Sequence, residues 1–460
     1  MLGGIACEPE PLPPFGEALL VVDTDLPVPR VVSRLRIDLH AEDGTVFASR
    51  DDVRPDARDW PTSFSVFSDD MARGRAVLVR LRAYPEGRVT SDGEPDEALA
   101  IDRLVRVRLE PGRRGRARVK LEGACAGIAA RLDDDGGRSC VAGEPDVPVA
   151  EVPLEDSLAR DPVSAVGGYG AEPCEGADDD AERVCVPGGA FLLGDRFHRP
   201  SDETISLDVY PERVVRLSRF VVDRDEVSVA RYRSVVARGF VPPIPVGVTE
   251  RDGAPGITAD ESCTFSAGPR GREDYPLSCV TWVTADAFCR FEGGTLPTEA
   301  QWEYVALAAS RTRKATYVWG EEPPACERAV FARTHLSRGC VDEGEGPQPI
   351  GTAQADVNVL GVRDLAGGLE EHMADSAARY SDPCWSSAAP VDPVCTKPVS
   401  PECVADAASL ECRVGGDFRH VTRGGGWATF ADRMRGVVRS SMQGGTASSV
   451  VGFRCVYPAP

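Results

Sequence analysis

The sequence contains few lysines and histidines for its length. Three lysines stand against 49 arginines in 460 residues, and there are five histidines. Acidic residues outnumber basic ones by 73 to 52, which gives a formal net charge of −21 at neutral pH. A surface of this charge repels phosphate backbones, so we expect no nucleic-acid partner. Because arginine replaces lysine throughout, an arginine-rich turn such as 113–116 is weak evidence for a basic site.

Long apolar runs and closely spaced cysteine pairs are also missing. No stretch of 18 apolar residues occurs, so the sequence predicts no membrane-spanning helix. No Cys-x-x-Cys pair, the spacing that favours zinc, is present. Cysteine itself is abundant, with 15 residues, which is typical of disulfides in an exported protein. Near neighbours in polar loops are Cys125 and Cys140, Cys174 and Cys185, Cys263 and Cys279, and Cys326 and Cys340.

Because fifteen is odd, one thiol is left over, and Cys7 is the candidate. It lies in "MLGGIACEPEPLPP", which resembles the end of a bacterial lipoprotein signal, so we interpret residues 1–16 as a signal remnant and tether with Cys7 as the lipidation site. Gly4 stands where leucine is usual, and a charged start is missing. Two alternatives stay open: a start assigned too late, or an ordinary terminal thiol. We expect an exported cell-envelope protein that touches the membrane only through this lipid.

Residues 17–122 alternate between apolar and polar side chains. "RLRIDLH" (34–40) places its apolar residues on one face and Arg36, Asp38 and His40 on the other, wet face. The same pattern recurs at 77–84, 104–110 and 117–122. Alternation interrupted by turn signals predicts an all-β antiparallel sandwich.

The pattern changes after this domain. Residues 123–182 are rich in Pro, Gly and acidic residues, and we interpret them as a cysteine-containing acidic linker without a core. From 183 to 460 short helices have clear caps: the predicted N-caps are Ser228, Thr284 and Thr298, and the first two helices are predicted to end at Gly239 and near Gly293. Gln301 completes a capping box with Thr298. The glycine-rich remainder predicts an α+β domain with little regular structure.

Several blocks in this domain occur together and in order. They are "VPGGAFLLGD" (186–195), "PERVVRLSRFVVDRDEVSVARY" (211–232), "YPLSCVTWVTADAFC" (275–289), "GGTLPTEAQWEYVA" (293–306), "YVWG" (317–320), "NVLGVRDLAGGLEEHMAD" (358–375), "VTRGGGW" (421–427) and "VGFRC" (451–455). The set resembles the formylglycine-generating-enzyme, or sulfatase-modifying-factor, family. The resemblance implies a variant of the C-type lectin fold for residues 183–460.

The enzyme of that family oxidises a target cysteine of a sulfatase to formylglycine, using Cu(I) held by two thiolates just after the glycine-rich strand. Aligning "RGGGW" places Thr429 and Met434 at the thiolate positions, Gly426 at a serine and Phe430 at a histidine. Cu(I) prefers soft thiolates, and a hydroxyl with one thioether is a poor substitute. We therefore expect neither copper nor the family's catalytic residues.

The family also presents a glutamate turn to Ca²⁺, which here reads "GGLEEH" (367–372). Glu371 matches the ligand glutamate, whereas Gly368 replaces an asparagine. Carboxylate and carbonyl oxygens suit a hard cation, so this turn, with Asp375, is a possible calcium site. The alternative is a solvated acidic turn.

A second enzyme branch that the domain resembles, the sulfoxide synthases of ergothioneine synthesis, takes iron from a His-x-x-x-His-x-Glu set in a partner domain. The histidines of this chain are not spaced in that way, and its N-terminal domain reads as β rather than helical. We expect no such iron site.

The resemblance also implies disulfides. Cys289 and Cys455 match a pair that the family joins, and a second family pair falls on Ala306 and Gly436, where both cysteines are replaced. Four further cysteines lie in an insert at 381–415, and three connectivities stay open for them. They are Cys384, Cys395, Cys403 and Cys412.

We therefore expect a non-catalytic lipoprotein that binds a ligand or partner, either a protein or a glycan. Long loops on a rigid scaffold suit binding, with the insert at 381–415 and the loop at 241–274 shaping the surface. Trp385 is a candidate contact, and the alternative for it is a packing role. Two other functions stay open: an oxidoreductase with a non-standard site, and a structural component of an envelope complex.

Overall fold

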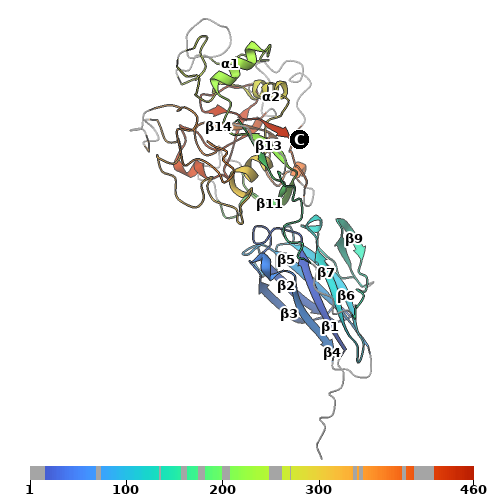
Figure 1. Ribbon diagram of the computed structural model, residues 1–460. Coiled ribbons are helices and arrows are strands. Elements are labelled where there is room, and N and C mark those ends of the chain that lie inside the picture. Colours follow the sequence, from blue (N-terminus) through green and yellow to red (C-terminus); the bar gives the residue numbers. More distant parts are fainter. Residues whose placement is uncertain are drawn as a thin grey trace, which may run out of the picture. The chain divides into compact units, whose positions relative to one another are not determined.

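The computed structural model divides the chain into two compact units, residues 1–169 and 170–460 (Figure 1). It describes residues 16–68, 74–133, 136–156, 163–174, 182–198, 208–247, 262–269, 271–334, 339–340, 345–385, 390–397 and 419–459. Cys7, Cys403 and Cys412 lie outside these ranges. Within them, no helix is long and apolar enough to cross a membrane.

The first unit consists of strands, as the alternating sequence predicts. Its two larger sheets have the orders β4-β1-β7 and β3-β2-β5-β6. The strands are β1 (Gly16–Thr24), β2 (Arg34–His40), β3 (Val46–Val53), β4 (Thr62–Ser68), β5 (Arg75–Tyr84), β6 (Ile101–Leu109) and β7 (Arg114–Leu121). A single turn of 3-10 helix, Ala57–Asp59, precedes β4. One pairing differs from the antiparallel expectation, because β1 and β7 run parallel, with Glu17 opposite Arg114.

The face of β2 expected to be wet is partly covered. Asp38 and His40 are buried, in contrast to the sequence-based prediction. Asp38 accepts hydrogen bonds from Arg82 at 2.5 Å and from Arg36 at 3.2 Å. The carboxylate of Glu94 forms an ion pair with each of these guanidinium groups at 2.7 Å. Opposite charges on neighbouring strands thus satisfy one another, so this face is buried without apolar side chains.

The segment 123–182 is not a linker along its whole length, which corrects the sequence-based interpretation. Its first part, with β8 (Arg138–Val141), β9 (Glu144–Pro148) and the helical turn Gly123–Cys125, belongs to the first unit. Cys125 and Cys140 form a disulfide there, as expected. The amino-acid composition does not reveal these strands, because both are short and β9 is largely exposed and so has few apolar residues to form a pattern.

The described residues of the second unit form three small sheets joined by long loops. The sheets have the orders β10-β13-β18, β11-β12 and β16-β15-β14-β17. Their strands are β10 (Arg183–Val186), β11 (Gly189–Leu193), β12 (Arg213–Leu217), β13 (Phe220–Asp223), β14 (Glu370–Ser376), β15 (Arg419–Arg423), β16 (Arg439–Gln443), β17 (Val451–Gly452) and β18 (Val456–Pro458). Little regular structure and few helices agree with the expected α+β class.

Three helices follow the predicted caps with one shift. The helix α1 (Val229–Ala237) is capped by Ser228, as predicted. The helix α2 (Trp282–Phe291) is capped by Thr281, three residues before the predicted Thr284, whose hydroxyl instead donates to the carbonyl of Ile244. The helix α3 (Glu299–Glu303) has the predicted capping box and continues as a π-helical turn (Tyr304–Ala308). Short 3-10 turns lie at Pro383–Trp385 and Ala431–Met434.

Disulfides join distant parts of the second unit. Cys289 of α2 pairs with Cys455, 166 residues away, as the family resemblance implied. The local pairs also form, and Cys384 pairs with Cys395 within the insert. Cys289 and Cys455 are completely buried, so this bridge fixes α2 against the C-terminal strand inside the core.

Loop length predicts the relative importance of these bridges. In the chain-entropy model, removing Cys289–Cys455 (C289A/C455A) costs about 5 kcal/mol, whereas removing Cys174–Cys185 (C174A/C185A), which spans 11 residues, costs about 3 kcal/mol. Urea unfolding of both variants measures the two costs. Equal midpoints, or a larger loss for the short bridge, would contradict this ranking.

Candidate functional site

The glycine-rich loop after β15 is positioned by a buried group of charges. Arg423, the last residue of β15, donates to Glu299 of α3 at 2.9 and 3.2 Å, and Arg439 of β16 donates to both oxygens of the same carboxylate at 2.6 Å. All three side chains are fully buried. Burial alone raises the pKa of Glu299, but the two guanidinium groups outweigh it and hold the pKa below its ordinary value.

A second carboxylate extends this group. Glu303 accepts hydrogen bonds from Arg423 at 3.0 Å, from Lys314 at 2.6 Å and from the main-chain N–H of Gly194 at 2.7 Å. The hydroxyl of Tyr380 lies between Arg423 and Glu299. Each buried charge therefore faces an opposite one, which is the condition for burying ions without a large penalty.

The loop itself turns sharply at two glycines. Gly424 and Gly425 adopt φ values of 100° and 69°, which favour glycine. A Cβ on Gly425 would lie 2.4 Å from the Met434 methyl carbon and 3.2 Å from the Thr429 hydroxyl. The structure thus brings Thr429 and Met434, the two positions aligned with thiolates, to the same glycine.

The two side chains are committed to packing and hydrogen bonding within the loop. The Thr429 hydroxyl bonds both the N–H and the carbonyl of Gly426 at 2.9 Å. Met434 is fully buried in an apolar cluster with Phe331 and Cys340. Phe430, at the position aligned with the histidine, is 58% exposed. Three of the four aligned positions therefore meet, and Phe430 does not join them.

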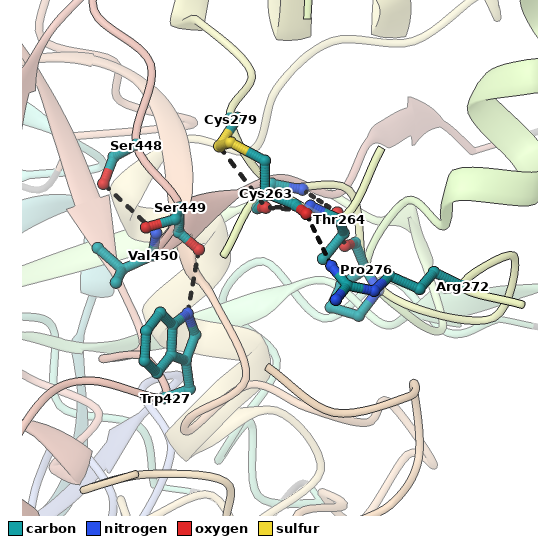
Figure 2. The surroundings of a disulfide bond; sticks show 10 residues. Cys263, Thr264, Arg272, Pro276, Cys279, Trp427, Ser448, Ser449 and Val450 are labelled. Atoms are coloured by element: carbon teal, nitrogen blue, oxygen red, sulfur yellow. Dashed lines mark hydrogen bonds between the residues drawn. A yellow bond between two sulfur atoms is a disulfide. The ribbon is translucent and has the colours of Figure 1, made fainter. Parts of the chain in front are cut away.

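Trp427 ties the loop to a neighbouring disulfide. Its ring N–H donates to the carbonyl of Ser449 at 3.0 Å. The carbonyl of the preceding Ser448 accepts the N–H of Cys279, which is bonded to Cys263. Figure 2 shows the hydrogen bond between Trp427 and Ser449, together with Ser448 and the two cysteines. The loop is thus held at Trp427 as well as through Arg423.

The possible calcium residues have other partners. Both oxygens of Glu371 face Arg454, with distances of 2.6 to 2.9 Å, and one also accepts the ring N–H of Trp302 at 3.0 Å. The carbonyl of Gly368 accepts the N–H of Trp427. Glu371 is therefore an internal counter-ion rather than a turn open to solvent, and its donor set does not fit a calcium ion.

Further carboxylates lie near Arg454 but form no metal site. Burial, followed by the charges of Asp364 and Glu371, raises the pKa of Glu226 well above its ordinary value. Burial raises the pKa of Asp364 to about 6. Within the described residues, no three His, Cys, Asp or Glu side chains are arranged to hold a metal. Glu226 and Asp364 instead accept main-chain N–H groups, from Leu369 at 3.0 Å and from Gly351 at 2.6 Å.

The two residues flanking Glu371 have partners other than Arg454. Glu370 accepts a hydrogen bond from the Thr422 hydroxyl at 2.6 Å, and burial raises its pKa. The ring of His372 contacts the carbonyl of Val280 at 3.2 Å, and burial lowers its pKa to about 4. Both flanking side chains are therefore committed to partners within the protein.

The described part of the insert, residues 381–385 and 390–397, has side chains and main-chain groups packed in the core. Trp385 is 1% exposed and packs edge-on against Tyr380 at 5.2 Å, so the prediction of a ligand contact is wrong and the packing alternative holds. Asp375 accepts the N–H groups of Cys395 and Glu299 at 2.7 Å. The insert residues beyond 397 and much of the loop 241–274 lie outside the described ranges.

The lost family disulfide leaves a packed contact. A Cβ on Gly436 would lie 2.6 Å from Leu307, the neighbour of Ala306. Gly436, one of the two aligned positions, thus packs directly against the residue that follows the other.

Sequence reasoning missed the buried charges. Glu299, Arg423, Arg439 and Arg454 were not singled out, although Glu299 lies in "PTEAQWEY" and Arg454 in "GFRC". The feature that could have indicated their burial is a charged residue within an otherwise apolar or glycine-rich block. A single sequence does not say which of 49 arginines is buried.

A comparison with family models shows to which protein family this chain belongs. The model described as "Sulfatase-modifying factor enzyme 1-like domain" matches residues 171–459, more than half of the chain. The chain belongs to this family. Membership agrees with the order of blocks in the sequence and with the two-unit division, whose second unit begins at residue 170.

Curated relatives include active and inactive family members. The formylglycine-generating enzyme of Streptomyces coelicolor is 28% identical over 63% of this chain and 94% of its own length. The inactive C-alpha-formylglycine-generating enzyme 2 of Mus musculus is 24% identical over 62% and 88%. A hercynine oxygenase of Mycolicibacterium smegmatis is 28% identical over 53% and 54%. The solved structure of PvdO from Pseudomonas aeruginosa shares 19% identity, with coverage of 60% and 94% and a TM-score of 0.42.

A buried ion pair is costly to break. Replacing Glu371 with glutamine leaves Arg454 charged and buried without its counter-ion, so we expect E371Q to lose about 3 kcal/mol or more of unfolding free energy. The control is E322Q, at an exposed pair with Arg328 at 3.7 Å, for which we expect a change within about 0.5 kcal/mol. Denaturant unfolding of both variants measures the difference, and a loss in E371Q no larger than in E322Q would refute the counter-ion role.

Asp375 makes stability depend on pH in a defined direction. Burial and the nearby Glu299 raise its pKa from 3.8 to about 7. Between these values the folded protein keeps a proton that the unfolded chain has lost, so the unfolding free energy falls as pH rises. Asparagine cannot titrate, and D375N should therefore gain stability relative to the wild type from about pH 4 to about pH 7. Thermal unfolding at several pH values tests this, and a flat difference would contradict it.

Proposed function

We propose that this chain is a non-catalytic member of the family that works by binding a ligand or partner. One observation carries the proposal: the positions aligned with the copper thiolates are a hydroxyl and a thioether, and both are used within the protein. The Thr429 hydroxyl is bonded to Gly426, and Met434 is packed against Phe331 and Cys340. Neither side chain offers Cu(I) a thiolate.

The names of the relatives support both a non-catalytic and a catalytic function. The name of the Mus musculus relative describes an inactive protein, so the family includes members without the activity. The Streptomyces coelicolor relative is named as an enzyme, which keeps an oxidoreductase with a non-standard site as the second candidate. Glu370, Thr422 and Arg433 lie beside the loop and are the polar residues that such a site would use.

Export is part of the proposal. Six disulfides lie in the described residues, and such bonds persist in oxidising compartments. We propose a cell-envelope location with Cys7 as the lipid attachment point and the first unit as a spacer. Assembly into an envelope complex is a form of partner binding and fits the same proposal.

A copper titration separates binding from catalysis. With a competing Cu(I) chelator, we expect the wild-type protein to bind no stoichiometric copper and to leave a cysteine-containing peptide unoxidised. The double variant T429C/M434C is the positive control, because both side chains meet at Gly425 and would supply two soft ligands. The single variant T429C should bind more weakly. Stoichiometric copper or peptide oxidation in the wild type would overturn the proposal.

A further inference from the structure

A cavity of about 260 Å³ lies in the second unit, lined by parts of the chain that the loop after β15 does not include. Its walls come from the turn between β12 and β13, the connection from α2 to α3, the insert and the C-terminal strand β18. The lining residues include Arg219, Phe220, Thr295, Gln301, Asp392 and Tyr457.

The cavity has a fixed frame. Thr295 pairs with Val456 through two main-chain hydrogen bonds of 2.8 and 2.9 Å. A Cβ on Gly294 would lie 2.4 Å from the carbonyl of Val456, so only glycine allows this close approach. Asp392 accepts both the N–H and the hydroxyl of Ser218, at 2.8 and 2.7 Å. Binding at this place would therefore require little rearrangement, which favours affinity.

The polar groups in the wall are of mixed kinds. Gln301 uses its amide oxygen to accept the N–H of Thr298, which orients its amide NH₂ as a donor. Arg219 is held by the carbonyl of Pro173 at 2.8 Å, and Asp392 supplies acceptors. The cavity thus offers hydrogen-bond donors and acceptors together with the aromatic residues Phe220 and Tyr457.

Charge and size narrow the ligand class. The wall carries one cationic and one anionic side chain, Arg219 and Asp392, so no net charge selects an ion. The volume is just below the range of about 300 to 1,000 Å³ that drug-sized ligands occupy. The donors and acceptors of the wall, of which Asp392 is exposed and Gln301 half-buried, favour a ligand that can bond to them over an apolar one. A small, neutral molecule with many hydroxyl groups satisfies all three conditions.

We propose that this cavity binds a neutral sugar unit, free or at the end of a glycan. Asp392 and Gln301 would bond the hydroxyl groups, because a carboxylate accepts and an amide NH₂ donates. This deepens the proposed function, on which it rests, by naming a ligand class and a place for it. The site is independent of the Thr429–Met434 loop.

Titration of the full-length protein with single sugars tests the proposal. The probes are glucose, galactose, mannose and N-acetylglucosamine, with glucuronic acid as the anionic comparison. We expect at least one neutral sugar to bind with a Kd on the order of 1 mM, as weak single-site contacts allow. In T295W a large side chain fills the cavity, and in D392A an acceptor is lost; each should weaken binding by about tenfold or more.

The control is T352W, which places the same bulk at an exposed threonine outside the cavity and should bind as the wild type does. Should T295W fail to fold, D392A still decides. Binding of glucuronic acid alone, unchanged binding in both cavity variants, or no binding of any neutral sugar at about 10 mM, tenfold above a Kd of about 1 mM, would overturn the proposal. None of these results bears on copper, so the proposed absence of catalysis would stand or fall separately.

Discussion

The second unit is organised around Glu299, whose carboxylate lies among buried cations. Arg423 and Arg439 both donate to it, and Glu303 balances the second arginine charge. Buried ions are tolerated only when they are paired and hydrogen-bonded, so these side chains have little freedom to move. Because Arg423 ends β15 and Glu299 begins α3, the network fixes where the strand ends and therefore where the glycine-rich loop starts.

The glycine-rich loop brings together side chains that are used within the protein. Gly424 and Gly425 turn the chain, and Thr429 and Met434 meet at Gly425. The Thr429 hydroxyl bonds to the loop backbone, and the Met434 thioether fills an apolar cluster. The buried charges that position this loop are separate from the side chains that it presents, so the scaffold does not depend on which residues those are.

Much of this architecture could be predicted from the sequence, and the failures share a cause. Alternation predicted the strands of the first unit, and caps at Ser228 and Thr298 predicted two helix starts. Predictions failed where polar residues are buried: Asp38 and His40 look solvent-facing by period alone, and Glu371 looks like an open ligand until Arg454 is placed beside it. Glu371 and Arg454 are 83 residues apart in the chain, so their pairing leaves no local pattern in the sequence. The prediction that Trp385 contacts a ligand failed for a similar reason, because the sequence does not show that Tyr380 packs against it.

The most direct test of the central claim is an anomalous difference map from crystals soaked in a Cu(I) or Ag(I) salt. Soft ions of this kind seek sulfur, so the map reports whether the loop after β15 can still hold one. The account predicts no metal peak between Thr429 and Met434, with the Met434 methyl group still packed in its cluster. A peak there, coordinated by the Met434 sulfur, would contradict it.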